Sequence, residues 1–562
     1  MMANRSSFQT GQRATLVSVA LVSLSFSPRL LDPFNLPKFF ILIVSACSLL
    51  ALLTMTFQKI TQWNKYERQA VVASLIFSIS LCLTVFVSQA NLSSQLYGEF
   101  GRLTGLITQL SLLILFIAGQ HFFCESSAIL LLRLLILIGL LNGIYGFLQW
   151  LQFDIVSWSI STNEVIGTLG NSNFLSAFLG MSSLSALALS FGKIKKAVKV
   201  NYGLIALFLF LVVILTNSLQ GTIIIAVGSI IIVYKRFLET KTAPIRIFYF
   251  LLVSIFSSLT ILGVFNIGFL KQFLFQDSNI YRLDYWNSAL NMISASPIYG
   301  RGLDTYGSYY REYRSAEAAS RRGLDQVSNS AHNAYLEVLV NGGIILFTSY
   351  LIILFLTFKS LFRILKRLTK FDEIGVGLGI VWIGYFLQSL ISVSSIAILS
   401  WGWLLSGAII AYDQSIAEKQ IHTKKGNEEN RTINFLNRAH LLRIFLSILI
   451  GIYVAIWPIK QDMKFREAFQ SGNAKLLLES ATSFPYGQRY GELAAKILLD
   501  NGFNREAKDV AEFVIIRNSR AYDAYLLLMA NPLIDGQSRR TLEIELIKIE
   551  PKLPKLVSQN ID

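Results

Sequence analysis

Long apolar runs recur along most of this 562-residue chain and constrain its fold more than any other feature. A helix needs about 20 apolar residues to cross the hydrocarbon of a bilayer. Only 15% of the residues are charged, against about 25% in soluble domains. We therefore predict an all-α, polytopic membrane bundle with about thirteen spans, which excludes a water-soluble enzyme. The expected spans are residues 12–28, 38–57, 69–89, 104–120, 129–151, 172–192, 202–217, 220–234, 246–269, 335–358, 374–395, 397–412 and 441–459.

The distribution of Lys and Arg predicts the orientation of the bundle. Bases gather in every second loop, as in residues 193–199 and 235–241, whereas residues 152–171 contain none. Loops rich in Lys and Arg stay on the cytoplasmic side. We therefore expect a multi-pass protein of the inner (plasma) membrane, with a cytoplasmic N-terminus and an extracytoplasmic C-terminal domain. This topology accounts for the net charge of +16, so no nucleic-acid partner is expected.

Two polar segments fall on the predicted outer side. We divide the chain into an N-terminal tail and first span (1–37), a membrane bundle (38–269), a large outer loop (270–334), a continuation of the bundle (335–459) and a soluble helical domain (460–562). The outer loop is longer than ordinary connections and rich in Tyr and Trp, so we expect it to be ordered. The last segment resembles tetratricopeptide repeats in its helix lengths and small Ala positions, with a plain helical bundle as the alternative.

Chemistry is expected at the outer face rather than within the spans. The span interiors carry almost no ionisable residues, with Glu337 as the main exception, and this argues against an ion-coupled transporter. The three cysteines have neither disulfide nor metal-binding spacing. The outer loops contain no paired-carboxylate motif. We therefore expect no metal and no cofactor.

Three motifs follow one another around the large outer loop: Arg282-x-x-Tyr285-Trp286, then Pro297-x-x-Gly300-Arg301-Gly302, then Ala331-His332-Asn333-Ala334-Tyr335-Leu336-Glu337. With segments 101–105 and 167–174, their order resembles the O-antigen ligase and O-antigen polymerase superfamily over about residues 30–415. One departure is Gln220, which stands where many members carry Arg. Gly300 and Gly302 are expected to serve turn geometry, and the arginines at 311, 314, 321 and 322 to form a solvated or lipid-facing run.

The resemblance implies a membrane glycan transferase. Its donor would be a saccharide on undecaprenyl diphosphate, and its acceptor a hydroxyl of a lipid, a glycan or a protein at the outer face. Such a reaction must stabilise charge on the departing diphosphate and remove a proton from the nucleophile. Arg suits the first task because it is always charged and binds phosphate oxygens in pairs. His suits the second because its pKa lies near working pH. We assign these catalytic roles to Arg282 and His332.

His332 is expected at a helix N-terminus with Ser330 as the N-cap, where the helix dipole favours the neutral imidazole. The expected substrate-binding residues are Arg102, Gln220, Arg301, Trp286, Asn333 and Glu337. Two plainer readings stay open: His332 as a capping or interfacial residue, and Arg282 with Trp286 as an interfacial anchor pair. For the whole chain, the alternatives are a transporter of a small anion such as bicarbonate and a non-catalytic membrane scaffold.

Overall fold

The computed structural model describes residues 3–57, 63–156, 158, 164–239, 241–275, 277–323, 325–367, 371–422 and 438–552. Within them every expected span is a helix, and eleven of these helices are long and apolar enough to cross a membrane. The all-α membrane bundle is thus confirmed. The helices at the expected spans are α1 (Ala3–Leu24), α2 (Asn35–Thr56), α3 (Lys65–Val87), α5 (Leu106–Phe122), α6 (Ile129–Trp150), α7 (Ser172–Ser190), α8 (Lys196–Leu215), α9 (Leu219–Val233), α10 (Ala243–Val264), α15 (Ala334–Arg367), α16 (Glu373–Ile391), α17 (Ile396–His422) and α18 (Arg438–Ser471).

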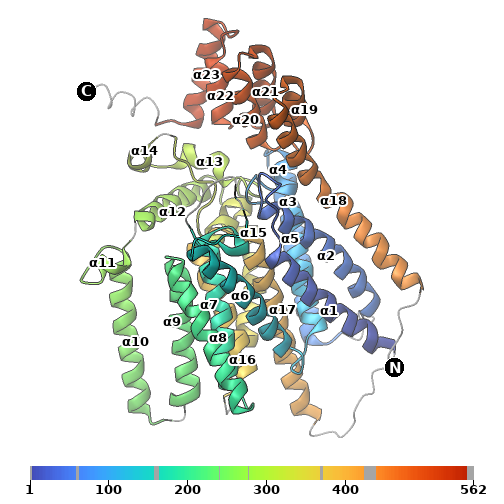
Figure 1. Ribbon diagram of the computed structural model, residues 1–562, viewed down its shortest axis with the longest axis vertical. Coiled ribbons are helices and arrows are strands. Elements are labelled where there is room, and N and C mark those ends of the chain that lie inside the picture. The colour runs from blue at the N-terminus through green and yellow to red at the C-terminus, as the bar shows by residue number, and fades with distance from the viewer. Residues whose placement is uncertain are drawn as a thin grey trace.

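Helix α17 occupies the centre of the bundle, because its most apolar stretch is buried along its whole length. It packs against α5, α15 and α16, while α7 packs against α6, α8, α9 and α16. Helix α10 is the opposite case, since only 6% of its apolar stretch is buried and it stands at one edge (Figure 1). Residues 58–62, 368–370 and 423–437, which belong to the basic loops expected inside, lie outside the described residues.

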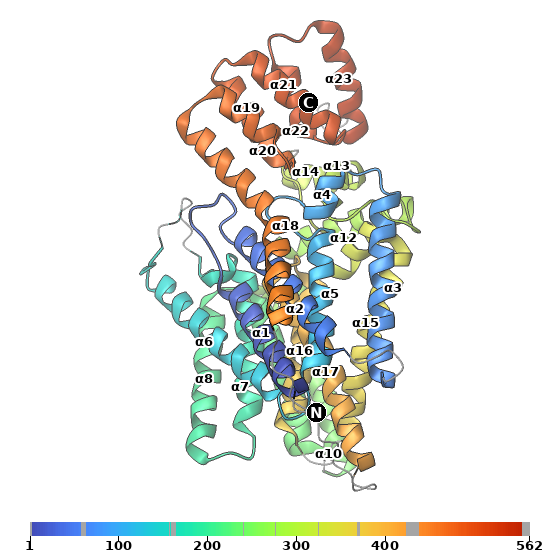
Figure 2. The same ribbon diagram turned by 90° about the vertical axis from the view of Figure 1, so that its right-hand side faces the viewer.

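The two polar segments meet at the same end of the bundle. The outer loop folds into α12 (Asp277–Ala295), α13 (Tyr306–Tyr313) and α14 (Ala316–Arg322), and the short α4 (Leu92–Tyr97) lies beside them. The N-terminus lies toward the opposite end (Figure 2). The large outer loop is therefore ordered, as expected from its aromatic content.

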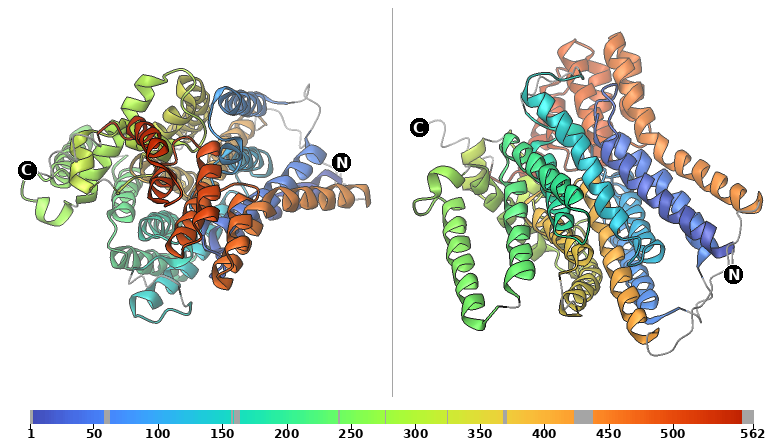
Figure 3. Two further views of the ribbon diagram at one scale, coloured as in Figure 1. Left: turned by 90° about the horizontal axis from the view of Figure 1, so that it is seen from above. Right: turned by 60° about the horizontal axis from the view of Figure 1, so that its bottom comes forward.

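The C-terminal residues form a stack of helices that we call the tail domain: α19 (Ala474–Thr482), α20 (Gln488–Asp500), α21 (Asn504–Arg517), α22 (Tyr522–Ala530) and α23 (Gly536–Ile549). Each helix packs on the next, around a core of small and apolar side chains. Helix α18 runs from the bundle into this domain without interruption. Seen from above, the tail helices lie over the bundle (Figure 3). Their likeness to tetratricopeptide repeats stays a prediction.

Candidate functional site

The site is built on a break in helix α15. Gly342 and Gly343 have non-helical backbone angles, so the helix is divided into a short outer part and a long membrane part. A break leaves backbone groups without partners inside the helix, and such groups must be satisfied by other protein groups at membrane depth. The turn at 297–302 supplies them through three hydrogen bonds: Arg301 N to Val340 O (2.8 Å), Gly302 N to Asn341 O (2.9 Å) and Ile344 N to Pro297 O (2.8 Å).

Glycine is required where the turn meets the broken helix. Gly300 has φ +68°, and a Cβ there would lie 2.4 Å from the backbone of Asn341. Gly343 has φ +58°, and a Cβ there would lie 2.3 Å from the carbonyl oxygen of Ile298. Positive φ is costly for residues with a Cβ, and both contacts are with backbone that cannot rotate away. The expected turn role of Gly300 is thus explained by close backbone approach.

The start of α15 differs from the expectation in its cap. The Asn333 Oδ1 accepts hydrogen bonds from the backbone N–H groups of Tyr335 (3.0 Å) and Leu336 (3.1 Å), so Asn333 is the N-cap. The prediction of Ser330 as N-cap was wrong, because its hydroxyl is used elsewhere. It accepts from the backbone N–H of His332 (3.1 Å) and donates to the Glu337 carboxylate (3.1 Å). Ser330 therefore ties the backbone of His332 to Glu337.

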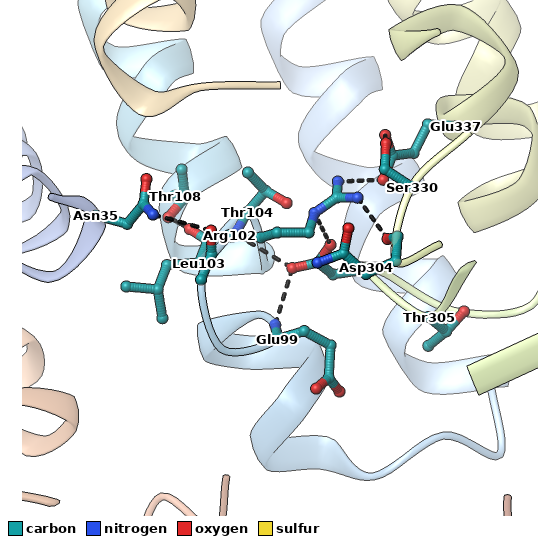
Figure 4. A network of polar contacts seen from close by, with 12 residues as sticks. Asn35, Glu99, Arg102, Leu103, Thr104, Thr108, Asp304, Thr305, Ser330 and Glu337 are labelled. Atoms are coloured by element: carbon teal, nitrogen blue, oxygen red, sulfur yellow. Dashed lines mark hydrogen bonds and ion pairs between the residues drawn. The ribbon is translucent and has the colours of Figure 1, made fainter. Parts of the chain in front are cut away.

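Glu337 belongs to a buried ion-pair network centred on Arg102 (Figure 4). The Arg102 Nε lies 3.0 Å from the Asp304 carboxylate, and another guanidinium nitrogen pairs with the Glu337 carboxylate. A third bond runs to the carbonyl oxygen of Asn329 (2.7 Å). Arg102 is only 4% exposed. Its guanidinium is paired with protein carboxylates, and the substrate contact expected from the sequence stays a prediction.

The electrostatics of this network follow from burial. Burial lowers the pKa of Arg102, but the carboxylates of Asp304 and Glu337 outweigh it, so the net pKa of Arg102 is raised and the residue stays charged. The pKa of the neighbouring Glu99 is also raised, which for an acid favours the neutral form. Burial, with the nearby charge of Asp304, raises the pKa of Glu99 to about 7. The loop at 98–105 is thus held by the buried guanidinium of Arg102 and the acidic side chains around it.

Tyr285 links the surroundings of the two predicted catalytic residues. The imidazole of His332 stacks on the Tyr285 ring, with centroids 5.0 Å apart and planes 24° apart. Arg282 precedes Tyr285 by three residues on α12, so both lie on one helix face. Arg282 donates a hydrogen bond to Asn279 Oδ1 (2.9 Å). Burial lowers the pKa of Arg282, yet a guanidinium starts above 12 and remains protonated.

Trp286 and Arg301 border the same aromatic group. Trp286 packs against the cluster that contains Tyr285 and Tyr310, and its Nε1 is buried without a hydrogen-bond partner among the described residues. The guanidinium of Arg301 lies 5.0 Å from the ring centre of Tyr309 and also contacts Tyr313. Both residues therefore contact the aromatic cluster formed by α12 and α13.

Gln220 lies in a separate group. It lies two residues after Ser218, the N-cap of α9, and its Oε1 is buried without a hydrogen-bond partner within the described part of the chain. The Ser218 hydroxyl donates to Asn173 Oδ1 (2.7 Å), and the Gly221 N–H donates to Ser176 Oγ (3.1 Å). Two segments singled out in the sequence, 167–174 and 216–221, thus pack against each other.

Two expectations about charged residues are corrected. Lys38 is a second ionisable residue buried in a span, 1% exposed, and donates to the carbonyls of Ser25 and Thr168. The arginines at 311, 314, 321 and 322 are not a solvated or lipid-facing run, since Arg311 and Arg314 are buried against Glu550. Arg321 pairs with Asp284 (2.7 Å), and the side chain of Arg322 lies outside the described residues.

Sequence reasoning missed Tyr285 and Asp304 as parts of the site. Tyr285 stood inside the Arg-x-x-Tyr-Trp motif, so its signal was visible. Asp304 follows the Gly-rich turn, and its pairing with Arg102 joins residues 202 positions apart. A local pattern could not have shown this partner, because the chain folds back across the outer end of the bundle.

Comparison with known families adds a result for this region. Residues 204–351 match the model of a family described as O-antigen ligase, which covers roughly a quarter of the chain. The matched segment contains Gln220, Arg282, Arg301 and His332 and excludes Arg102. No curated protein matches the chain. The family match confirms the resemblance drawn from the motifs and supports an O-antigen ligase-like membrane glycosyltransferase as the general class.

Proposed function

We propose that this O-antigen ligase-like protein transfers a saccharide from undecaprenyl diphosphate to an acceptor hydroxyl at the outer face of the plasma membrane. The observation that carries the proposal is the stacking of His332 on Tyr285, which follows Arg282 by three residues on α12, within the segment that matches the family. Helix α12 and the start of α15 lie at the end of the bundle where the outer loop and tail domain meet. A guanidinium and an imidazole are the two kinds of group that the reaction needs.

The reaction forms one bond and breaks one. The acceptor oxygen attacks the anomeric carbon of the donor sugar, and the bond from that carbon to the phosphate oxygen breaks. The hydroxyl proton passes to a ring nitrogen of His332, which acts as general base. Undecaprenyl diphosphate leaves with the bonding electron pair. Stacking on Tyr285 fixes the plane of the imidazole, so the base is oriented before the acceptor arrives.

Arg282 stabilises the leaving group in this scheme. Its hydrogen bond to Asn279 uses one nitrogen, Nη1, of a guanidinium that carries five N–H donors. Partial burial strengthens its attraction for phosphate oxygens because fewer waters compete. Arg301, held between Tyr309 and Tyr313, is placed as a second cation for the diphosphate. Arginine thus does here what a divalent cation does in metal-dependent transferases.

The remaining predicted residues take supporting roles. Trp286 offers an aromatic surface beside Arg282 for the polyprenyl chain or a sugar. Asn333 holds the start of α15, and Glu337 holds the His332 backbone through Ser330. Gln220 would contact the donor only from the separate group on α9. The N-terminus is proposed to be cytoplasmic and the tail domain extracytoplasmic.

The test is glycan transfer by the purified full-length protein with a polyprenyl-diphosphate-linked saccharide. We expect His332→Ala and Arg282→Ala each to abolish transfer while the protein still inserts and purifies normally. His440→Ala and Arg246→Ala, at the start of α18 and on the isolated α10, serve as matched controls and should keep full activity. Full activity of both site variants would contradict the proposal. Anion uptake by proteoliposomes that contain no glycan would favour the transporter instead.

A further inference from the structure

The tail domain contacts the outer loop through a buried ion pair. Arg314, directly after α13, pairs with Glu550, directly after α23, and both side chains are fully buried. Arg311 lies 3.8 Å from the same carboxylate. A buried charge is very costly unless it is paired. The position of α23 relative to α13 is therefore fixed by the need to keep these charges together.

Further contacts hold α13 on other sides. Arg520 of the tail pairs with Glu312, and its guanidinium lies 4.0 Å from the ring centre of Tyr309. The guanidinium of Arg311 lies 3.7 Å from the ring centre of Tyr522. The Lys552 ammonium donates to the backbone carbonyl of Glu312. The tail thus contacts α13 and the adjoining Arg314 through side chains from α22, from the segment before α22 and from the segment after α23.

Helix α13 in turn supports the residue on which His332 stacks. The Arg314 guanidinium lies over the Tyr310 ring, 5.9 Å from its centre. Tyr310 packs edge-on against Tyr285 with centroids 5.8 Å apart. Tyr306 donates a hydrogen bond from its hydroxyl to the Tyr285 carbonyl oxygen (2.9 Å). A continuous series of contacts therefore runs from Glu550 to His332.

We propose that Glu550 and Arg314 are positioning residues for glycan transfer, and that the tail domain is a structural part of the catalytic unit. Helix α18 already connects the tail to the bundle covalently, so tethering alone does not require a buried ion pair at the far side of the domain. The ion pair instead fixes the position of α13, and α13 fixes the position of Tyr285 against His332. The expected loss of activity rests on the proposed transferase function, whereas the expected structural coupling between the tail domain and Tyr285 does not.

The kinetic test uses the full-length protein with Glu550→Gln, which removes the charge and keeps the shape. A misplaced base slows chemistry more than donor binding, and a shift of about 1 Å can cost 100-fold in rate. We expect kcat to fall by at least about tenfold with little change in KM for the lipid-linked donor. Glu543→Gln makes the same change on the exposed side of α23 and should leave both constants unchanged. An unchanged kcat in Glu550→Gln would overturn the inference.

A structural measurement keeps the inference separate from the proposed function. Hydrogen–deuterium exchange of Glu550→Gln should be faster than in the parent protein over residues 306–313 and 328–333, and unchanged in α7. Arg520→Gln, which breaks a half-exposed pair, should give the same pattern more weakly. Exchange changes confined to the tail domain would refute the coupling even in an active transferase. A chain that shows the coupling but transfers no glycan would refute the proposed function alone.

Discussion

Arg102→Ala tests whether this arginine positions the site or binds substrate. The substitution leaves the carboxylates of Asp304 and Glu337 buried without their shared cation. It also removes the hydrogen bond to the carbonyl oxygen of Asn329. Removing one partner of a buried ion pair typically costs about 3–5 kcal/mol. We therefore expect the free energy of unfolding to fall by about that amount.

The assay is unfolding of the purified protein in mixed micelles, followed by tryptophan fluorescence, next to transfer activity at a temperature where the variant stays folded. Arg282→Ala is the comparison, because Arg282 is half-buried and pairs with a neutral side chain. We expect Arg282→Ala to lose transfer with little loss of stability, and Arg102→Ala to lose stability first. If Arg102→Ala kept the stability of the parent and weakened donor binding, the positioning role would be refuted.

Three further results are expected. Gly343→Ala should lower thermal stability and transfer together, because it forces a Cβ against the Ile298 carbonyl at φ +58°, whereas Gly203→Ala, which meets open space, should be neutral in the same melting assay. Burial and the charge of Asp523 raise the pKa of Glu492 from 4.5 to about 7, so the folded tail favours the neutral acid and loses up to about 3 kcal/mol of stability as pH rises through that range. Glu492→Gln should therefore flatten the dependence of melting temperature on pH between pH 5 and 8. A pH dependence equal to that of the parent protein would contradict this. Transfer should survive EDTA treatment in metal-free buffer, since arginine stabilises the diphosphate, and loss that Mg²⁺ restores would argue for metal-assisted chemistry.

The bundle could be predicted from the sequence because each span carries its own signal. An apolar run long enough to cross a bilayer forms a helix whatever its neighbours, since the membrane leaves its backbone no other partner. Arg282 and His332 could be proposed because their motifs are local. The break in α15 was partly visible as Gly342-Gly343, but adjacent glycines alone do not show that a distant turn completes the helix.

Charged side chains were the harder case, because their role depends on partners far along the chain. Arg102 was predicted to bind substrate and Arg314 to be solvated or lipid-facing, yet each is buried against a carboxylate more than 200 residues away. Ser330 was misread for a related reason. A serine hydroxyl at this position can cap the helix or donate a hydrogen bond to the Glu337 carboxylate seven residues later. Which of the two forms depends on the path of the chain before α15.

The broken helix explains how the proposed catalytic groups of the outer loop are held firmly. A loop that only rests on a bundle can move away without breaking hydrogen bonds, whereas the turn at 297–302 satisfies backbone groups of α15 itself. Lifting the turn would leave these groups unpaired near the membrane, and each unpaired group costs free energy. The same movement would separate Asp304 from Arg102 and Arg314 from Glu550. The loop, the outer part of α15 and the tail domain are therefore expected to move as one body.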